Sequence, residues 1–207
     1  DVAGGGARLA LPPGQVVNLE GQFQAQQSPT RLIAGHSVVS LVGVFAVLYT
    51  RYRSGLLVLL VMANIPLALV GSVAAMWLTG VTLSVASMVG FITLAGIATR
   101  NGILKISHYL NLCRFEGESF GPAMVVRGSL ERLTPVLMTA LVAGLALTPL
   151  LLAADAPGKE ILHPVAVVIF GGLISSTLLD TLLTPALYLR LGRRATERLL
   201  NDTDDVF

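Results

Sequence analysis

The sequence predicts an all-α integral membrane protein, with five transmembrane helices preceded by a short polar segment. Of its 207 residues, 54% are hydrophobic and only 13% are charged, whereas soluble domains carry about 25% charged residues. The apolar residues form five blocks, each long enough for the roughly 20 residues that a helix needs to cross a bilayer. Lysine and arginine fall between these blocks rather than in one patch, which indicates membrane topology and argues against a nucleic-acid-binding surface.

The segment before the first block, residues 1–31, is polar and too short to be a domain. Its turn signals are Pro12-Pro13-Gly14 and Gly21, which leave room for a short strand over 15–20 and the start of a polar helix over 22–27. The N-terminus has no initiator methionine, basic n-region or apolar h-region, so it does not read as a signal peptide. We therefore expect this chain to be a piece of a longer protein.

The transmembrane domain is expected over residues 32–192, and residues 193–207 form a tail. We place its five helices at about 32–50, 55–78, 83–109, 134–154 and 161–189. The connector over 111–132 alternates apolar and charged residues, which is typical of an amphipathic helix on the membrane surface. Its glycines and proline interrupt helical periodicity, so an ordinary solvated loop remains an equal alternative.

Basic residues between the helices predict the orientation. Short loops rich in lysine and arginine stay in the cytoplasm. This rule places the C-terminus in the cytoplasm and residues 1–30 on the opposite, outer side. The basic residues that fall together on the cytoplasmic side are Arg51, Arg53, Arg114, Arg127, Arg132, Arg190, Arg193, Arg194 and Arg198.

Charged residues also lie inside the predicted helices. An arginine, lysine or aspartate at a helix centre costs about 2.5–3.5 kcal/mol to insert, so such residues usually face a protein interior or a water-filled path. Arg100 and Asp180 each lie a few residues past the midpoint of a helix that runs inward, so their depths are similar and an Arg100–Asp180 pair is geometrically possible. Lys105 lies nearer a helix end, and we expect it to snorkel to the interface.

Polar residues accompany both charges. Thr93, Gly96, Arg100 and Ser107 share one helical face, with Asn101 and His108 on its flank, and Gly172, Ser176, Asp180 and Thr184 form a stripe spaced by four. Hydroxyls beside a titratable acid and a cation are the groups that a proton path needs. Purely structural ion pairing of Arg100 and Asp180 is the alternative reading.

Other kinds of site find little support in the sequence. The three histidines show no metal-ligand spacing, the single cysteine excludes an intrachain disulfide, and no GxxxxGK[ST] motif is present. No nucleophile–base arrangement is visible. We expect no cofactor, no metal site made of these residues and no enzyme activity.

The sequence resembles a known transporter family in several motifs that occur in order. Three stretches resemble the last three membrane helices of resistance–nodulation–division (RND) transporters: GFITLAGIATRNGILKISHY, LTPVLMTALVAGLALTPLLL and HPVAVVIFGGLISSTLLDTLLTPALY. LPPGQVVNLEGQFQAQQ resembles the end of the family's second periplasmic portion. ATRNGI and GGLISSTLLDTLLTP are most similar to the heavy-metal-efflux branch, the cobalt–zinc–cadmium and copper–silver exporters.

The resemblance implies the last five helices of a twelve-helix bundle in a bacterial inner-membrane pump that exports heavy-metal cations by proton antiport. Residues 1–31 would end the second periplasmic porter and docking portion. It implies a homotrimer that joins a periplasmic adaptor and an outer-membrane channel. The family's relay residues match Arg100, Asn101, Arg132 and Thr139, whereas Asp180 joins this set on the physical argument alone. Arg100 would act as a fixed charge that tunes a proton-carrying acid in the N-terminal half, which is absent from this chain.

Two other functions remain open at this stage. Related RND transporters export drugs or other organic molecules, and porter-domain residues outside this sequence would distinguish these substrates from metals. A truncated or split product that is inactive without its N-terminal half is the structural alternative.

Overall fold

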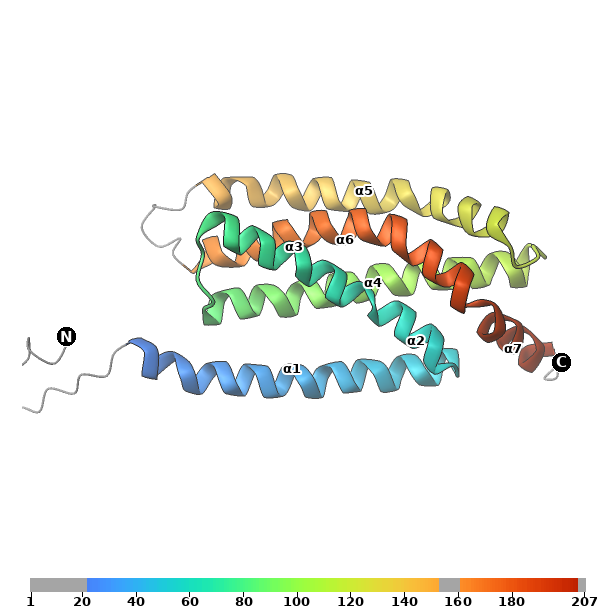
Figure 1. The fold of residues 1–207 in the computed structure, drawn as a ribbon, viewed down its shortest axis with the longest axis horizontal. Helices are drawn as coiled ribbons and strands as arrows, with labels where there is room; N and C mark the ends of the chain where they lie inside the picture. Colours follow the sequence, from blue (N-terminus) through green and yellow to red (C-terminus); the bar gives the residue numbers. More distant parts are fainter. Residues whose placement is uncertain (1–21, 153–160, 205–207) are drawn as a thin grey trace, which may run out of the picture.

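The computed structural model describes residues 22–152 and 161–204, and every regular element in these ranges is a helix. Figure 1 shows the helices packed roughly along one long axis. They are α1 (Gln22–Tyr52), α2 (Gly55–Met62), α3 (Asn64–Thr79), α4 (Val85–Phe115), α5 (Pro122–Leu152), α6 (Leu162–Leu191) and α7 (Arg193–Asp204).

Five helical segments of the described chain are long and apolar enough to cross a membrane, which confirms the predicted fold class. They are Arg31–Tyr52, Gly55–Thr79, Val85–Phe115, Pro122–Leu152 and Leu162–Leu191. The strand expected over 15–20 lies outside the described residues, whereas the polar helix start expected at 22–27 belongs to α1.

The second membrane segment is kinked rather than straight. It divides at Ala63 into α2 and α3. Pro66 explains the position of the kink, because a proline within a helix lacks the N–H that would bond the carbonyl four residues earlier and its ring clashes with that carbonyl. The carbonyl concerned belongs to Met62, the last residue of α2. Asn64 starts α3 directly at this kink and is buried, with 1% of its surface exposed.

The turn between α3 and α4 follows from its sequence. Gly80 ends α3 with a φ of 69°, a left-handed conformation that glycine adopts without a steric penalty. Ser84 then caps α4: its hydroxyl accepts from the Ser87 N–H at 3.2 Å, and the Ser87 hydroxyl accepts from the Ser84 N–H at 2.7 Å. This reciprocal capping satisfies N–H groups that a helix start otherwise leaves unpaired.

The connector expected over 111–132 is neither a surface helix nor a long loop. Helix α4 continues to Phe115 and α5 begins at Pro122, so only residues 116–121 are non-helical. The tight turn is held by Arg127, whose guanidinium contacts Glu116 at 2.6 Å, Glu131 at 2.9 Å and also Glu118. These contacts let two long helices meet at a short turn, which the alternating sequence pattern did not reveal.

Helices α3 and α6 approach each other most closely. A Cβ on Gly71 would lie 2.1 Å from the Ser175 Cβ, and one on Gly171 would lie 2.3 Å from the Ala75 Cβ. Hydroxyls cross the same interface, because Ser175 donates to the Leu67 carbonyl at 2.8 Å. Ser72 likewise donates to a carbonyl of α6, that of Val168, at 2.7 Å. Small residues and interhelical hydrogen bonds are the usual means by which helices associate in membranes.

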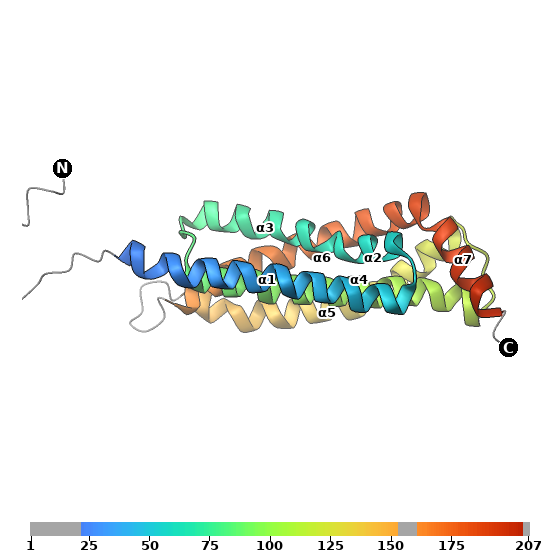
Figure 2. The same cartoon turned by 90° about the horizontal axis from the view of Figure 1, so that it is seen from below.

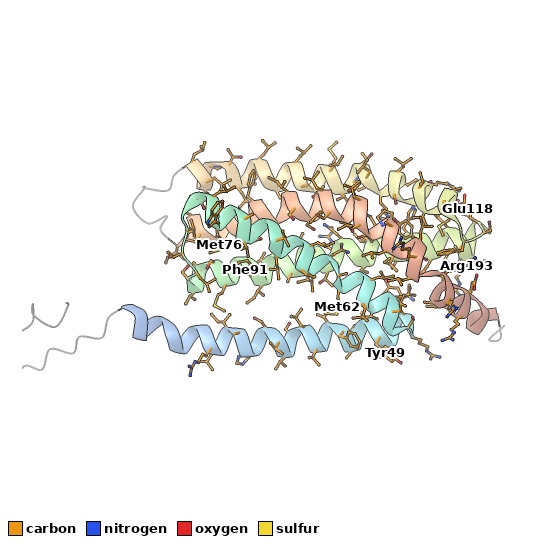
Figure 3. All side chains as sticks on the ribbon, in the orientation of Figure 1. Tyr49, Met62, Met76, Phe91, Glu118 and Arg193 are labelled. Carbon is orange, nitrogen blue, oxygen red and sulfur yellow. The ribbon has the colours of Figure 1, made fainter. Side chains whose placement is uncertain are left out.

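A second region of tight packing lies at the end of the bundle where the arginine-rich turns meet. The α1–α2 junction, the α4–α5 junction and α7 share this end (Figures 1 and 2). Figure 3 shows Glu118 and Arg193 here and Met76 and Phe91 at the opposite end. The Tyr109 and Tyr188 rings lie 4.8 Å apart, and the Tyr188 hydroxyl lies 2.8 Å from that of Thr196. This bond ties α7 to α6, so the segment expected as a tail begins with a helix that packs against α6.

Helices α1 and α5 leave broad apolar faces uncovered. Among the side chains of α1 that the structure describes, Leu48 and Tyr52 are the buried ones. Helix α5 buries Met124, Val125 and Gly128 near its start, whereas Leu141 and Leu145 further along are 62% and 73% exposed. Lipid or further protein must cover faces of this kind, as expected for membrane helices.

The α3–α6 contact leads to a first prediction. Gly71→Ala should lower the stability of the protein by about 1–3 kcal/mol, because the added methyl group would overlap Ser175 and the Gly171 carbonyl, 2.4 Å away. Thermal unfolding in detergent measures the effect. Gly35→Ala in α1 is the matched control, since nothing lies within 4 Å of its added Cβ. Equal unfolding temperatures for the two variants would show that the close contact is not formed.

Candidate functional site

Helix α4 carries two cations that face different sides. Arg100 is exposed, whereas Lys105 is buried with 4% of its surface exposed. Five residues of an α-helix correspond to about 140° of net rotation and about 7.5 Å of rise. One side of α4 therefore presents Lys105 to the interior of the bundle, and another presents Arg100 to a cleft.

Lys105 forms an ion pair with Asp180 of α6. Its Nζ lies 2.6 Å from Asp180 Oδ2. The same Nζ donates to the backbone carbonyl of Asp180 at 2.8 Å. Asp180 is 1% exposed, so both charges are removed from solvent. A buried charge is tolerated when it is both paired and hydrogen-bonded, and these two contacts meet that condition for Lys105.

The other carboxylate oxygen of Asp180 belongs to a polar group at the α2–α3 kink. The Thr184 hydroxyl donates to Asp180 Oδ1 at 2.7 Å and lies 3.1 Å from Asn64 Oδ1. Asn64 Nδ2 and Ser176 Oγ are buried and have no hydrogen-bond partner among the described residues, and Asp180 Oδ2 contacts Lys105 as an ion pair rather than as a hydrogen bond. We call Asn64, Lys105, Asp180 and Thr184 the buried polar cluster. It joins α3, α4 and α6 at one point.

Local backbone features explain how this cluster forms. The kink before Pro66 places Asn64 against α4, at a position where α4 has Gly102. A Cβ on Gly102 would lie 2.6 Å from Asn64 Nδ2 and 2.8 Å from the Val61 carbonyl. Glycine is therefore the residue that lets the kinked segment come this close to α4.

Two expectations from the sequence need correction here. Lys105 does not snorkel to the interface, because Asp180 provides a partner in the interior. The Arg100–Asp180 pair that similar depths allowed is not formed in the described part of the chain, since Asp180 is bonded to Lys105 instead. The missed signal was the helical spacing of Lys105, which shares a face with the buried Leu94 and Ala98. The polar stripe on α6 is buried as a whole: Gly172, Ser176, Asp180 and Thr184.

Arg100 lies at an apolar cleft between α1, α3 and α4. The cleft has a volume of about 1000 Å³, and its lining includes Leu41 and Leu48 of α1, Leu69 of α3, and Gly96 and Arg100 of α4. Among the side chains that the structure describes, none forms an ion pair or a hydrogen bond with Arg100. An unpaired guanidinium in an apolar membrane segment is costly, so this face of α4 requires a partner from elsewhere.

The remaining candidate relay residues are spread over other surfaces. Asn101 is half-buried beside Arg100. On α5, Arg132 is half-buried, and the exposed Thr139 donates its hydroxyl to the Val136 carbonyl at 2.9 Å. Neither α5 residue lines the cleft that holds Arg100. The described chain thus separates these residues rather than gathering them into one site.

The three histidines have three unrelated partners. His36 Nδ1 lies 2.7 Å from the Leu32 carbonyl, and His163 Nδ1 lies 3.1 Å from the Leu150 carbonyl. His108 Nε2 contacts the Glu131 carboxylate at 2.7 Å. In the part of the chain that the structure describes, no three His, Cys, Asp or Glu side chains are grouped to hold a metal ion.

Comparison with known proteins gives consistent similarities. The AcrB/AcrD/AcrF family profile matches residues 6–192. The chain is 39% identical over 191 residues to the cobalt-zinc-cadmium resistance protein CzcA of Cupriavidus metallidurans, covering 92% of this chain and 18% of that protein. It is 41% identical over 181 residues to the protein HelA of Legionella pneumophila, covering 87% of this chain and 17% of that protein. The chain therefore spans under a fifth of the length of these relatives.

A solved structure agrees with these relatives. The crystal structure of a heavy metal efflux pump, crystal form II, superposes with a TM-score of 0.73 at 40% identity, covering 83% of this chain and 17% of that one. At this identity and TM-score, the similarity extends beyond a shared helical architecture. The helices described above are thus arranged as in part of a larger protein, that heavy metal efflux pump.

The buried ion pair leads to a second prediction. Asp180→Leu should destabilise the protein by about 3–5 kcal/mol, because it leaves the Lys105 ammonium buried without its counter-ion. Thr181→Val on the same helix is the control, since the Thr181 hydroxyl bonds only the Thr177 carbonyl of its own helix. Chemical unfolding in detergent micelles measures both. A loss no larger for Asp180→Leu than for Thr181→Val would contradict the pairing.

Proposed function

The chain belongs to the AcrB/AcrD/AcrF family of RND transporters, and we propose that it contributes five membrane helices to a proton-driven pump that exports heavy-metal cations. Family membership rests on the match over residues 6–192. The metal branch is supported by the names of the relatives, which include the cobalt-zinc-cadmium resistance protein CzcA and the nickel and cobalt resistance protein CnrA, both of Cupriavidus metallidurans. The heavy metal efflux pump of known structure supports the same substrate class.

The single observation that carries the proton-coupling part of the proposal is the position of Arg100. It stands within a membrane segment, on a cleft that is otherwise largely apolar, without a partner in the described chain. Arginine stays protonated under all ordinary conditions, so Arg100 cannot itself carry the transported proton. A fixed cation at this place favours the ionised form of a carboxylate brought next to it, and thereby sets the proton affinity of that acid.

We assign the proton relay to Arg100 and Asn101 on α4 and to Arg132 and Thr139 on α5. The carboxylate that takes up and releases the proton then comes from helices of the complete transporter outside this sequence. Uptake of a proton would neutralise that carboxylate and remove its attraction to Arg100, which gives the pump two electrostatically different states. We also include Asp180 in this assignment. Its role there depends on its bond to Lys105.

The remaining features of the complete pump are proposed from family membership. Residues 1–31 end a periplasmic porter and docking portion, residues 32–192 form the membrane domain, and residues 193–207 lie in the cytoplasm. The shared location of the arginine-rich turns at one end of the bundle supports this orientation (Figure 1). The pump is an inner-membrane homotrimer that joins a periplasmic adaptor and an outer-membrane channel.

The third prediction concerns Arg100 in the complete transporter. Arg100→Ala should abolish metal efflux driven by a pH gradient, because the proton-carrying acid loses the cation that tunes it. Arg100→Lys should retain part of the activity, since the charge remains, although an ammonium cannot bind a carboxylate through two parallel N–H groups as a guanidinium can. The measurement is the rate of metal transport by the complete transporter in proteoliposomes with an imposed pH gradient, made separately for zinc, cobalt and cadmium.

Arg114→Ala provides the matched control. Arg114 is also an exposed arginine of α4, but it lies in the last turn and its guanidinium stacks on Phe115, 5.5 Å from the ring centroid. This variant should pump normally. Efflux at the normal rate in Arg100→Ala, with protein level and trimer assembly unchanged, would refute the relay assignment.

A further inference from the structure

We propose that Lys105 and Asp180 are positioning residues that fix the rotation of α4, so that Arg100 faces the cleft where the proton-carrying acid approaches. The inference rests on the proposed function in one respect, the relay role of Arg100. It adds a residue, Lys105, that the relay assignment does not include. It also gives Asp180 a definite part, which is to act through α4 rather than to carry the proton.

The apolar contacts of α4 are extensive beyond the pair, where Tyr109 and Leu112 belong to the main hydrophobic cluster, but weaker along the stretch that carries Arg100. In that stretch Leu94 is the one large buried side chain, and it packs with Ala98 and with Ala68 of α3. Hydrophobic contact is non-directional, and small side chains offer little interdigitation to resist turning. Where α4 meets Asn64 at the α2–α3 kink, it has Gly102, which has no side chain to pack against the facing segment.

The contact between Lys105 and Asp180, in contrast, includes a directional hydrogen bond. Lys105 Nζ contacts two atoms of one residue, the carboxylate Oδ2 at 2.6 Å and the backbone oxygen at 2.8 Å. The backbone oxygen is fixed by helix α6, so this second bond locates the ammonium relative to the helix axis and not merely relative to a mobile side chain. Charge-assisted hydrogen bonds are also stronger than neutral ones.

The anchor itself is held in place from two further directions. The Thr184 hydroxyl, one turn along α6, donates to Asp180 Oδ1 at 2.7 Å. Asn64, at the α2–α3 kink, lies 3.1 Å from the same hydroxyl. Rotation of α4 would therefore have to break the contact between Lys105 and Asp180. Because Arg100 lies on the same rigid helix, about 7.5 Å away along the axis, this contact helps to fix its direction.

The geometry also argues against Asp180 as the proton carrier. Lys105 and Asp180 are 4% and 1% exposed, and neither lines the cleft that holds Arg100. Both carboxylate oxygens of Asp180 have contacts inside the bundle, Oδ2 with Lys105 and Oδ1 with Thr184. Arg100 differs in that its face of α4 opens on the cleft, where a second charge has room to come and go.

The test separates positioning from simple structural support. In the complete transporter, K105M/D180L replaces the pair with apolar side chains and leaves no unpaired charge, so the variant is expected to fold. Its protein level and thermal unfolding should match the wild type, while the maximal rate of zinc efflux driven by a pH gradient falls at least tenfold. The KM for zinc should stay unchanged, because no substrate contact is altered.

A charge reversal provides the second variant. K105D/D180K restores an ion pair between α4 and α6 and should recover at least half of the lost efflux rate. R193Q/E197Q is the matched control, because it removes an exposed ion pair of 2.9 Å on α7 and should leave efflux unchanged. Wild-type efflux in K105M/D180L would overturn the inference, as would a charge-reversed variant that reaches normal levels but recovers nothing.

Two further outcomes keep this inference distinct from the function on which it rests. If Arg100→Ala pumps normally, the proposed relay fails regardless of the pair. If Arg100→Ala is inactive while K105M/D180L pumps like the wild type, only the positioning role fails. The pH profile of the residual efflux in K105M/D180L should keep the wild-type midpoint, and a shifted midpoint would show that Asp180 titrates during transport and would overturn the positioning account.

Discussion

The structure depends on one constraint: a polar group inside an apolar helix bundle must find its partner within the protein. The serines of the α3–α6 interface meet it by donating to carbonyls of the facing helix, as Ser72 does to Val168 and Ser175 does to Leu67. Lys105 and Asp180 meet it by pairing with each other. Arg100 is the exception: it lies in the middle of a described helix and has no partner among the described side chains. This exception is the feature of the structure that points to function.

The two cations of α4 therefore have complementary parts in this account. Lys105 is paired with Asp180, whereas Arg100 has no partner among the described side chains. In the pump that we propose, the first charge would hold the helix and the second would meet an acid from elsewhere in the transporter. The kink at Pro66 contributes by bringing Asn64 to the support.

Much of the fold was predictable from the sequence, because five apolar blocks separated by short polar turns leave few alternatives to membrane helices. The buried stripe on α6 followed from four-residue spacing. The α2–α3 kink was readable from Pro66 but was overlooked. The short α4–α5 turn depends on contacts from Arg127 of α5 to Glu116 and Glu118 in the turn, which the alternating pattern did not reveal. The partner of Asp180 was missed because depth was considered without the direction in which each side chain faces. The proposed relay residues on α4 and α5 came from family resemblance, and the described chain does not bring them together.

A structure of the complete transporter, at a resolution that shows side chains, would reveal what lies next to Arg100. We predict a carboxylate from outside this sequence within hydrogen-bond distance of the Arg100 guanidinium, with Lys105 still bonded to Asp180. A structure in which Arg100 faces lipid, or in which Asp180 has exchanged Lys105 for Arg100, would contradict this prediction.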